Sequence, residues 1–249
     1  MEQYKLLKSQ LKTLKLDAIN EIFAAKAAEY RKNDLDYIDY LGELIKEQME
    51  RRVERSINYR FREAKFPYIK TYEQFDKNYL DEFEYQKFEN LLNLSFLEKQ
   101  ENVLFIGPPG VGKTHLAIAL GVKACQKRIR TLFISMADLI EQINFARMNK
   151  LLERHIEKLI SNHLLIIDEI GYHPVSSEDA NIFFQLVSKK YEKNSIILTS
   201  NRSFNQWGDF FHDDVIAAAI LDRLIHHSHI FKISGNSYRM KDKIIDIKK

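Results

Sequence analysis

Cysteine is almost absent from this chain of 249 residues, in which Cys125 is the only one. A single cysteine excludes an intramolecular disulfide and fits a reducing cytoplasm. Long apolar runs are missing too, since no stretch reaches the ~18 consecutive apolar residues of a membrane span. Near the N-terminus, Glu2 and Lys5 occupy the region where a secretory signal would have its apolar core. We therefore expect a cytoplasmic protein without membrane contact.

Proline is also scarce, with four in the chain and none before Pro67. In this proline-free part, apolar residues such as Leu7, Leu11 and Leu14 recur at spacings of three and four, which is the period of an amphipathic helix. The pattern predicts two or three helices. They would form a small helical N-terminal domain over residues 1–66.

Neither sign of charge dominates, because the formal net charge is only +3, and local patches therefore matter more than the total. At the end of the helical domain, a basic strip is interleaved with aromatic side chains such as Tyr59 and Phe61. Such a strip suits phosphate contact and base stacking. A solvated helix face whose aromatics dock on the next domain explains it equally well. The DNA-binding candidates here are Arg51, Arg52, Arg55 and Arg60.

An acidic segment, residues 67–98, follows and is interpreted as a linker and lead-in helix. Over residues 99–249, short apolar runs alternate with helical patterns, which is typical of a parallel sheet with crossover helices. Leu164–Ile167 is continuously apolar, as expected of a strand buried on both faces. The sequence thus predicts an α/β fold with a five-stranded parallel sheet. The predicted strands are 103–106, 130–134, 163–167, 195–199 and 230–233, and the predicted helices are 113–126, 136–160 with a break near Asn149, 178–192 and 213–226.

The strongest motif follows the first predicted strand and opens the first helix of this part. Gly107-x-x-x-x-Gly112-Lys113-Thr114 in that context is a phosphate-binding loop, whose N–H groups and helix N-terminus form an anion cradle. Lys113 can reach the β- and γ-phosphates, and the Thr114 hydroxyl can ligate Mg²⁺. The residues predicted to bind ATP are Gly107, Pro108, Pro109, Gly110, Val111, Gly112, Lys113, Thr114 and His115.

Two other predicted strands end in polar residues. Asp168 and Glu169 follow Leu164–Ile167, where Asp168 would hold Mg²⁺ and Glu169 would act as general base on water. This adjacent pair of acids is typical of ATP-hydrolysing machines. Asn201 follows the strand at 195–199 and would orient water beside the γ-phosphate. An asparagine at a strand end is more often a turn residue, but the other two motifs favour the catalytic interpretation.

Two arginines near the end of the chain have two interpretations each. Arg223 lies on the last predicted helix and can act in trans on a neighbour's nucleotide as an arginine finger. It can also pair with Asp222 or Asp214 on its own surface, and spacing alone favours this second interpretation. Arg239 can contact the phosphates in cis or lie on the surface.

Two further groups of residues were considered, one for metal binding and one for nucleic-acid binding. The histidines His226, His227 and His229 match no metal-ligand spacing and have no thiolate partners, so we expect no metal site there. A basic stretch on the helix after the second strand suits a nucleic-acid backbone or a solvated face that glutamates neutralise. Its DNA-binding candidates are Arg147, Lys150 and Arg154.

In this order, the motifs resemble those of the AAA+ ATPases. Gly107–Thr114 is similar to Walker A, Ile166–Glu169 to Walker B, and Thr199–Asn201 to sensor 1. Finer detail resembles the IstB family of transposition helper ATPases, which are related to the DnaC/DnaI helicase loaders. The segments that carry this resemblance are Asp168–Tyr172, Phe183–Val187, Thr199–Asn201, Ala219–His227 and Gly235–Arg239.

The resemblance implies that Arg223 is the finger acting in trans and that Arg239 is the sensor 2 arginine. It implies an ATPase that uses ATP and Mg²⁺, forms a homo-oligomer with ATP sites between subunits, and assembles on double-stranded DNA. It further implies DNA remodelling, and recruitment and stimulation of a partner transposase. The N-terminal helices would mediate self-association and DNA contact, and we expect no separate C-terminal lid.

The sequence departs from the family pattern at His173 and Lys190, both outside the catalytic motifs. It also departs at Phe211–Asp214, just ahead of the helix that carries Arg223, where a change bears on subunit packing. The alternative function is a DnaC/DnaI-like replicative helicase loader, which would share the same core. A small-molecule kinase has no use for the Asp168–Glu169 pair. A DNA-binding scaffold without hydrolysis would not need that pair either, nor Lys113.

Overall fold

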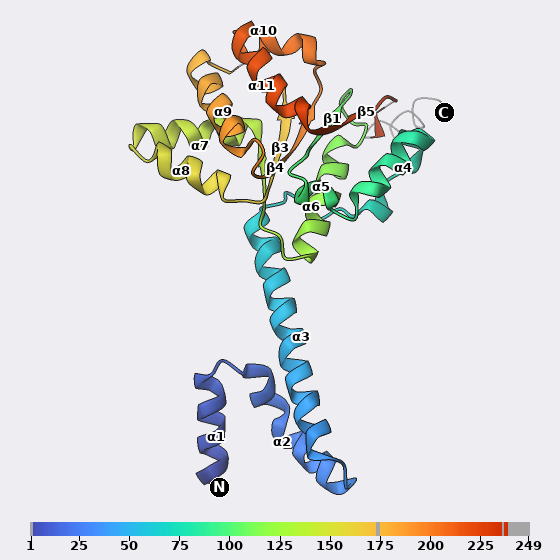
Figure 1. The fold of residues 1–249 in the computed structure, drawn as a ribbon, viewed down its shortest axis with the longest axis vertical. Coiled ribbons are helices and arrows are strands. Elements are labelled where there is room, and N and C mark those ends of the chain that lie inside the picture. Colours follow the sequence, from blue (N-terminus) through green and yellow to red (C-terminus); the bar gives the residue numbers. More distant parts are fainter. Residues whose placement is uncertain (1, 173–174, 236, 239–249) are drawn as a thin grey trace, which may run out of the picture. The chain divides into compact units, whose positions relative to one another are not determined.

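The computed structural model of the chain describes residues 2–172, 175–235 and 237–238. It divides into two compact units, Met1–Tyr59 and Arg60–Lys249. The division falls inside a long helix, ahead of the domain boundary expected at residue 66. The first unit is entirely helical where it is described, as predicted, and its helices are α1 (Glu2–Thr13), α2 (Asp17–Lys32) and most of α3 (Tyr37–Ala64) (Figure 1).

The first unit has a small core to which each helix contributes. Leu11, Phe23 and Leu44 pack together there. A side chain of α3 also closes the start of α2, because Gln48 Oε1 accepts a hydrogen bond from the Ala18 N–H at 3.1 Å. Such a partner satisfies one of the backbone donors that a helix N-terminus leaves open.

The second unit is built on a five-stranded sheet with the order β2-β3-β4-β1-β5, in which every neighbouring pair is parallel (Figure 1). This confirms the predicted α/β fold class. Since all the strands run in one direction, the residues that follow β1, β3 and β4 meet at one edge of the sheet. The strands are β1 (Asn102–Ile106), β2 (Thr131–Ser135), β3 (Leu164–Ile170), β4 (Ser195–Ser200) and β5 (Ser228–Lys232).

Helices cover both faces of the sheet, as the alternation along β3 shows. Leu164 and Ile166 pack with α4, α5 and α6 on one face. Leu165 and Ile167 pack with α7 to α11 on the other. Burial on both faces is why this strand has no polar position before its last residues. The helices are α4 (Glu82–Leu91), α5 (Ser95–Glu98), α6 (Lys113–Gln126), α7 (Met136–Met148), α8 (Leu152–Ile160), α9 (Ser177–Lys190), α10 (Trp207–Phe211) and α11 (Asp214–His226), with short 3₁₀ turns at Tyr72–Gln74, Lys77–Tyr79 and Phe204–Gln206.

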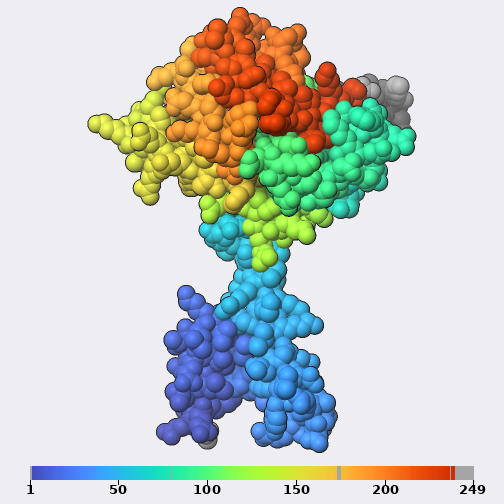
Figure 2. All heavy atoms as spheres, in the orientation of Figure 1, coloured from blue at the N-terminus to red at the C-terminus, as the bar shows by residue number. Residues whose placement is uncertain are grey.

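The predicted elements differ from the observed ones mainly at their ends. The break expected near Asn149 is present, because α7 ends at Met148 and α8 begins at Leu152. The turn between them stands out at the side of the second unit, in yellow-green (Figure 2). β3 runs to Ile170, three residues beyond the predicted strand, because hydroxyls of β4 bond to its end. No helix in the described part of the chain is long and apolar enough to cross a membrane.

Candidate nucleotide site

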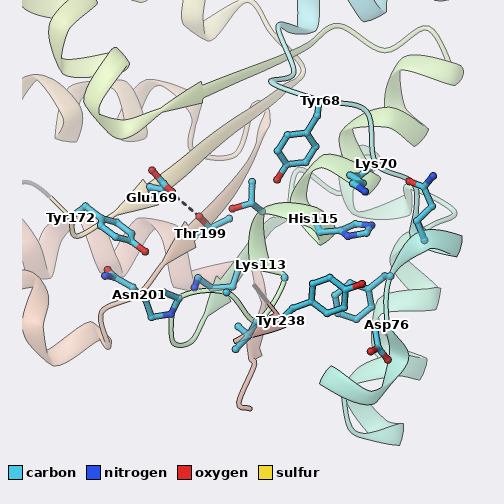
Figure 3. Close-up of a pocket in the computed structure, with 17 residues that line it drawn as sticks. Tyr68, Lys70, Asp76, Lys113, His115, Glu169, Tyr172, Thr199, Asn201 and Tyr238 are labelled. Carbon is cyan, nitrogen blue, oxygen red and sulfur yellow. Dashed lines mark hydrogen bonds between the residues drawn. The ribbon is translucent and has the colours of Figure 1, made fainter. Parts of the chain in front are cut away.

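A cavity of about 310 Å³ lies where β1, β3 and β4 end (Figure 3). Glu169 and Asn201, both predicted as catalytic, line it together with most of the predicted ATP-binding loop. The loop residues in its wall are Pro109, Gly110, Val111, Gly112, Lys113, Thr114 and His115. The cavity thus gathers three motifs that are far apart in the sequence.

The start of the loop fits only glycine. A Cβ atom on Gly107 would lie 2.0 Å from the carbonyl oxygen of Ile233, which is backbone and cannot move aside. Gly110 has a φ of +82°, and a Cβ there would lie 2.1 Å from Ser237 Oγ. The Tyr238 N–H also donates to the Gly110 carbonyl at 2.9 Å. The chain that follows β5 therefore packs directly on the loop.

The side chain of Lys113 is held against the backbone of the phosphate loop. Lys113 Nζ donates hydrogen bonds to the carbonyl oxygens of Gly107 and Pro108, each at 2.7 Å. These two residues thus belong to the site although they do not line the cavity. A fixed ammonium beside the loop N–H groups gives the anion cradle that phosphates need.

Two hydroxyls converge on the buried carboxylate of Asp168. Thr114 Oγ1 donates from the first turn of α6 and lies 2.9 and 3.1 Å from the two carboxylate oxygens. Thr199 Oγ1 donates from β4 to Oδ1 at 2.5 Å. Burial raises the pKa of Asp168, and the two hydroxyls and the charge of Lys113 oppose that rise. A carboxylate with a neighbouring hydroxyl is a set of hard oxygen donors, so the residues present fit Mg²⁺.

Glu169 sits in an unusual backbone conformation at the same strand end. Its φ of +64° is in the left-handed region, which is costly for a residue with a side chain, and the pairing of β3 with β4 is irregular between Ile167 and Ile170. The Glu169 N–H donates to Thr199 Oγ1 at 2.9 Å (Figure 3). Backbone strain of this kind is found mainly at functional sites. Here it gives the exposed Glu169 carboxylate a place in the cavity wall.

The side chain of Asn201 has an unmet polar atom. Its Oδ1 is buried and has no hydrogen-bond partner among the described residues. The strand ends around it are fixed, because Ser200 Oγ donates to the Ile170 carbonyl at 2.9 Å and Arg202 Nε donates to the Gly171 carbonyl at 2.7 Å. A buried acceptor without a partner is costly. This position thus suits contact with a bound polar group.

The wall opposite the catalytic acids comes from the segment that the sequence analysis treated as a linker. His115 Nε2 lies 2.7 Å from the Thr71 carbonyl, and the Phe75 ring meets the His115 ring edge-on at 5.4 Å. Burial lowers the pKa of His115. The signal available in the sequence was a set of aromatics shortly before the phosphate-loop strand. The lining residues missed there are Tyr68, Lys70, Gln74, Phe75 and Asp76. Elsewhere the cavity is lined by Tyr172, Thr199 and Tyr238, which lie in segments that carry the family resemblance but had no predicted role.

Arg223 does not line this cavity. Its Nη1 donates to the Ala219 carbonyl at 3.0 Å, and its guanidinium lies 4.7 Å from the centre of the Phe184 ring on α9. Neither Asp222 nor Asp214 is an ion-pair partner of Arg223 within the described residues. Arg239 lies outside the residues that the structure describes.

The DNA-binding candidates fall into two groups by their contacts. Several have partners within the chain: Arg51 pairs with Glu21 and Glu47, Arg55 with Asp17, Arg147 with Glu178, and Arg60 donates to the Arg128 carbonyl. Arg52, Lys150 and Arg154 are exposed. The second group is better placed for a phosphate backbone, because it need not break an internal ion pair.

Sequence comparisons with known proteins agree on one family. A family model described as IstB-like ATP binding protein matches residues 9–245. A Pseudomonas aeruginosa protein, named as an ATP-binding protein of insertion sequence IS21, is 43% identical over 243 residues, which cover 98% of this chain and 91% of that protein. Its counterpart from insertion sequence IS5376 of Geobacillus stearothermophilus is 39% identical and covers 92% of each chain. The crystal structure of DnaI has the same fold, with a TM-score of 0.57 at 18% identity over 66% of this chain and 90% of that one.

Proposed function

The chain belongs to the family of IstB-like ATP-binding proteins, with an AAA+ core, and on that premise we propose that it is an ATPase that assembles on duplex DNA and recruits a transposase. The observation that carries the hydrolysis proposal is the arrangement around Thr199. One hydroxyl fixes both Asp168 and the backbone of Glu169 at the rim of a cavity lined by the phosphate loop. The association with transposition comes from relatives that are named after insertion sequences.

The proposed chemistry follows from the donors and acceptors around the cavity. The loop N–H groups and Lys113 bind the phosphates of ATP. Thr114 and Asp168 would hold Mg²⁺, which neutralises charge on the phosphates when it is bound. Glu169 accepts the proton of the attacking water. Asn201 accepts a hydrogen bond from that water through its unmet Oδ1 and so orients it. The family resemblance adds Arg239 as a phosphate contact in cis.

This site has no described arginine in its wall that would stabilise the transition state. Arg223 lies instead over Phe184 of α9, and no residue of α11 is among the described residues that line the cavity. We assign it to the site of the next copy, in which ATP is held between two subunits. Such a finger raises the rate of hydrolysis by ~10³–10⁵. Hydrolysis would then wait for assembly, and ATP would act as a timing switch.

Self-association has a candidate surface in the first unit. Leu41, Ile45, Met49 and Val53 repeat every four residues along α3, and each side chain is more than 40% exposed. A stripe of this kind is typical of a helix that packs against another helix. We assign it to contact with a second copy of this chain.

DNA contact has a candidate surface in the second unit, at the turn between α7 and α8 (Figure 2). Phe145 and Met148 are 68% and 84% exposed there. The exposed cations Lys150 and Arg154 lie on the same turn and the start of α8. Cations beside exposed aromatic and apolar groups suit a nucleic acid, through phosphate contact and contact with bases.

Mixed assemblies test the proposal most directly. Glu169→Gln subunits lack the base but can donate Arg223, and Arg223→Ala subunits keep the base. Each variant alone should hydrolyse ATP at a small fraction of the wild-type rate on DNA. A mixture should recover activity that depends on the mixing ratio, because one interface in some pairs is complete. Absence of recovery at every ratio, with assembly verified by light scattering, would refute action in trans.

A further inference from the structure

A second cluster of chemically active side chains lies at the ends of α9 and α11. Glu192, His226 and His227 bring one carboxylate oxygen and two imidazole nitrogens within 4.8 Å of one another. All three side chains are exposed, and none lines the nucleotide cavity. The sequence analysis set the histidines aside for their spacing and the lack of thiolates, and it did not consider Glu192, which lies 34 residues before His226 in the chain.

We propose that Glu192, His226 and His227 bind a first-row transition-metal ion such as Zn²⁺. Two imidazoles and a carboxylate are the donors that Zn²⁺, Ni²⁺ and Cu²⁺ accept, whereas Mg²⁺ prefers oxygen alone. Three protein ligands leave at least one coordination position for water. The site therefore differs in chemistry from the oxygen donors Thr114 and Asp168.

The carboxylate is carried by a turn that is anchored on both sides. Glu192 has a φ of +54° and follows Lys190, whose Nζ is buried and donates to the Asn162 carbonyl at 2.7 Å. The turn closes through the Asn194 N–H, which donates to the Lys190 carbonyl at 3.1 Å. Asn194 Nδ2 also donates to the Ile160 carbonyl at 3.1 Å. The backbone that presents Glu192 is thus fixed before any ion arrives.

Hydrogen bonds also fix the positions of His226 and His227. The His227 carbonyl accepts from the Asn102 N–H at 2.7 Å, which ties the end of α11 to the start of β1. The Tyr191 hydroxyl lies 2.8 Å from His226 Nδ1 and holds that ring. Metal-bound histidines are commonly oriented by such an outer partner. Donors on fixed backbone bind an ion with less loss of side-chain freedom.

An ion pair explains this cluster less completely than a metal does. His227 Nε2 lies 3.6 Å from Glu192 Oε1, but a pair between exposed groups contributes little. It also involves only one of the two imidazole rings, whose centroids are 4.1 Å apart, and the other ring, that of His226, has the Tyr191 hydroxyl as its partner. A metal ion would use both imidazoles and the carboxylate at once. By contrast, His229 has its own carboxylate, Glu101, at 2.8 Å.

An ion at this position would tie the end of α9 to the end of α11. Arg223 lies on α11 three residues before His226, and it packs on Phe184 of α9. Metal binding would therefore hold fixed the helix that carries the proposed finger. This consequence rests on the proposed function, but the metal site itself does not.

Zinc binding to the untagged full chain tests the proposal. Isothermal titration with ZnCl₂, in excess Mg²⁺ and without nucleotide, should give one equivalent for the wild type. His226→Ala, His227→Ala and Glu192→Gln should each bind Zn²⁺ at least ~10-fold more weakly, the lower limit seen when a metal site loses even a supporting residue. His163→Ala removes an exposed histidine elsewhere and should bind like the wild type.

A second readout is the visible absorption of Co²⁺, which should appear in the wild type and be lost in Glu192→Gln. Glu192 lies in a turn between α9 and β4, outside the described helices. Circular dichroism checks that each variant is folded. The proposal is overturned if the titration shows no saturable binding, or if His163→Ala weakens it as much as His227→Ala. Because these measurements use no ATP, they stand apart from the test of Arg223 in trans.

Discussion

Thr199 Oγ1 donates a hydrogen bond to Asp168 Oδ1 at 2.5 Å, and the same oxygen accepts one from the Glu169 N–H at 2.9 Å. A single hydroxyl on β4 therefore sets the position of both acids at the end of β3. Because β3 and β4 are neighbours in the sheet, any shift between them would move the acids relative to the phosphate loop.

Thr199→Val should lower the rate of ATP hydrolysis and leave the fold intact. Valine keeps the shape but loses both bonds, and a hydrogen bond to a charged group is worth about 1.5–3 kcal/mol. We expect kcat to fall by about 10- to 100-fold, with a smaller change in nucleotide affinity. Steady-state kinetics measure the first and a fluorescent ATP analogue the second. Thr131→Val is the matched control, since Thr131 is buried on β2 and far from this contact.

Tyr68→Ala should weaken binding of adenine nucleotides by about tenfold, which is within the range for loss of one aromatic contact with a base. Tyr68 lines the wall formed by residues 68–76 and points into the cavity (Figure 3). Affinity for inorganic triphosphate should not change, because the phosphates lie on the loop side. Competition binding measures both. Tyr59→Ala removes a similarly exposed tyrosine outside the cavity and should have no effect.

Lys190→Met should flatten the dependence of stability on pH. Burial lowers the pKa of Lys190 from 10.5 to about 7, so between these values the unfolded chain binds more protons than the folded one. The free energy of unfolding should therefore rise with pH over that window, by up to ~1.4 kcal/mol per unit, and the gain should vanish in the methionine variant.

Urea denaturation at pH 7.0, 7.8 and 8.5 measures this slope. Higher pH is avoided because burial raises the pKa of Cys125 to about 11, and its ionisation in the unfolded chain opposes the trend. Lys189→Met alters the adjacent, exposed lysine and should keep the wild-type slope. Equal slopes for Lys190→Met and the wild type would contradict a neutral buried amine.

Lys150 and Arg154 should account for part of the salt dependence of DNA binding. Replacing both with alanine should reduce the slope of log K against log salt by about 2, since each phosphate contact contributes about 0.9. Phe145→Ala should lower affinity but leave the slope unchanged, because its contact is apolar. Fluorescence anisotropy over a salt series distinguishes the two. Replacement of Lys99 and Lys127, two exposed lysines elsewhere in the second unit, serves as the control. An unchanged salt slope in the Lys150 and Arg154 double variant would exclude this surface as a DNA contact.

Local patterns predicted the core of the site because its chemistry is contiguous in the chain. Gly107 to Thr114 carries its own strand, loop and helix start, and the strands β1, β3 and β4 are buried on both faces and therefore recognisable as apolar runs. Asp168 and Glu169 could be placed beside the loop because the ends of parallel strands meet at one edge. The resemblance to IstB proteins was confirmed by relatives that cover nearly the whole chain.

Other parts of the site could not be predicted, because they depend on distance in space. Thr199 gave no sign that its hydroxyl would serve two acids, and the segment 68–76 looked like an acidic linker until it folded against His115. The same limit applied to Arg51 and Arg55, whose basic pattern suited DNA. Their ion pairs with Glu21 and Asp17 come from another helix.

The sequence by itself determined the fold class, the phosphate loop and the identity of the two acids, because each of these depends on side chains that are neighbours in the chain or repeat with a fixed period. Only the tertiary structure decided what surrounds them: the hydroxyl that positions Asp168 and Glu169, the wall at residues 68–76, and the meeting of Glu192 with His226 and His227. The physical reason is that hydrogen bonds and metal ligation act over about 2–3 Å in space. Chain separation carries no information about such contacts until the sheet order and the helix packing are known.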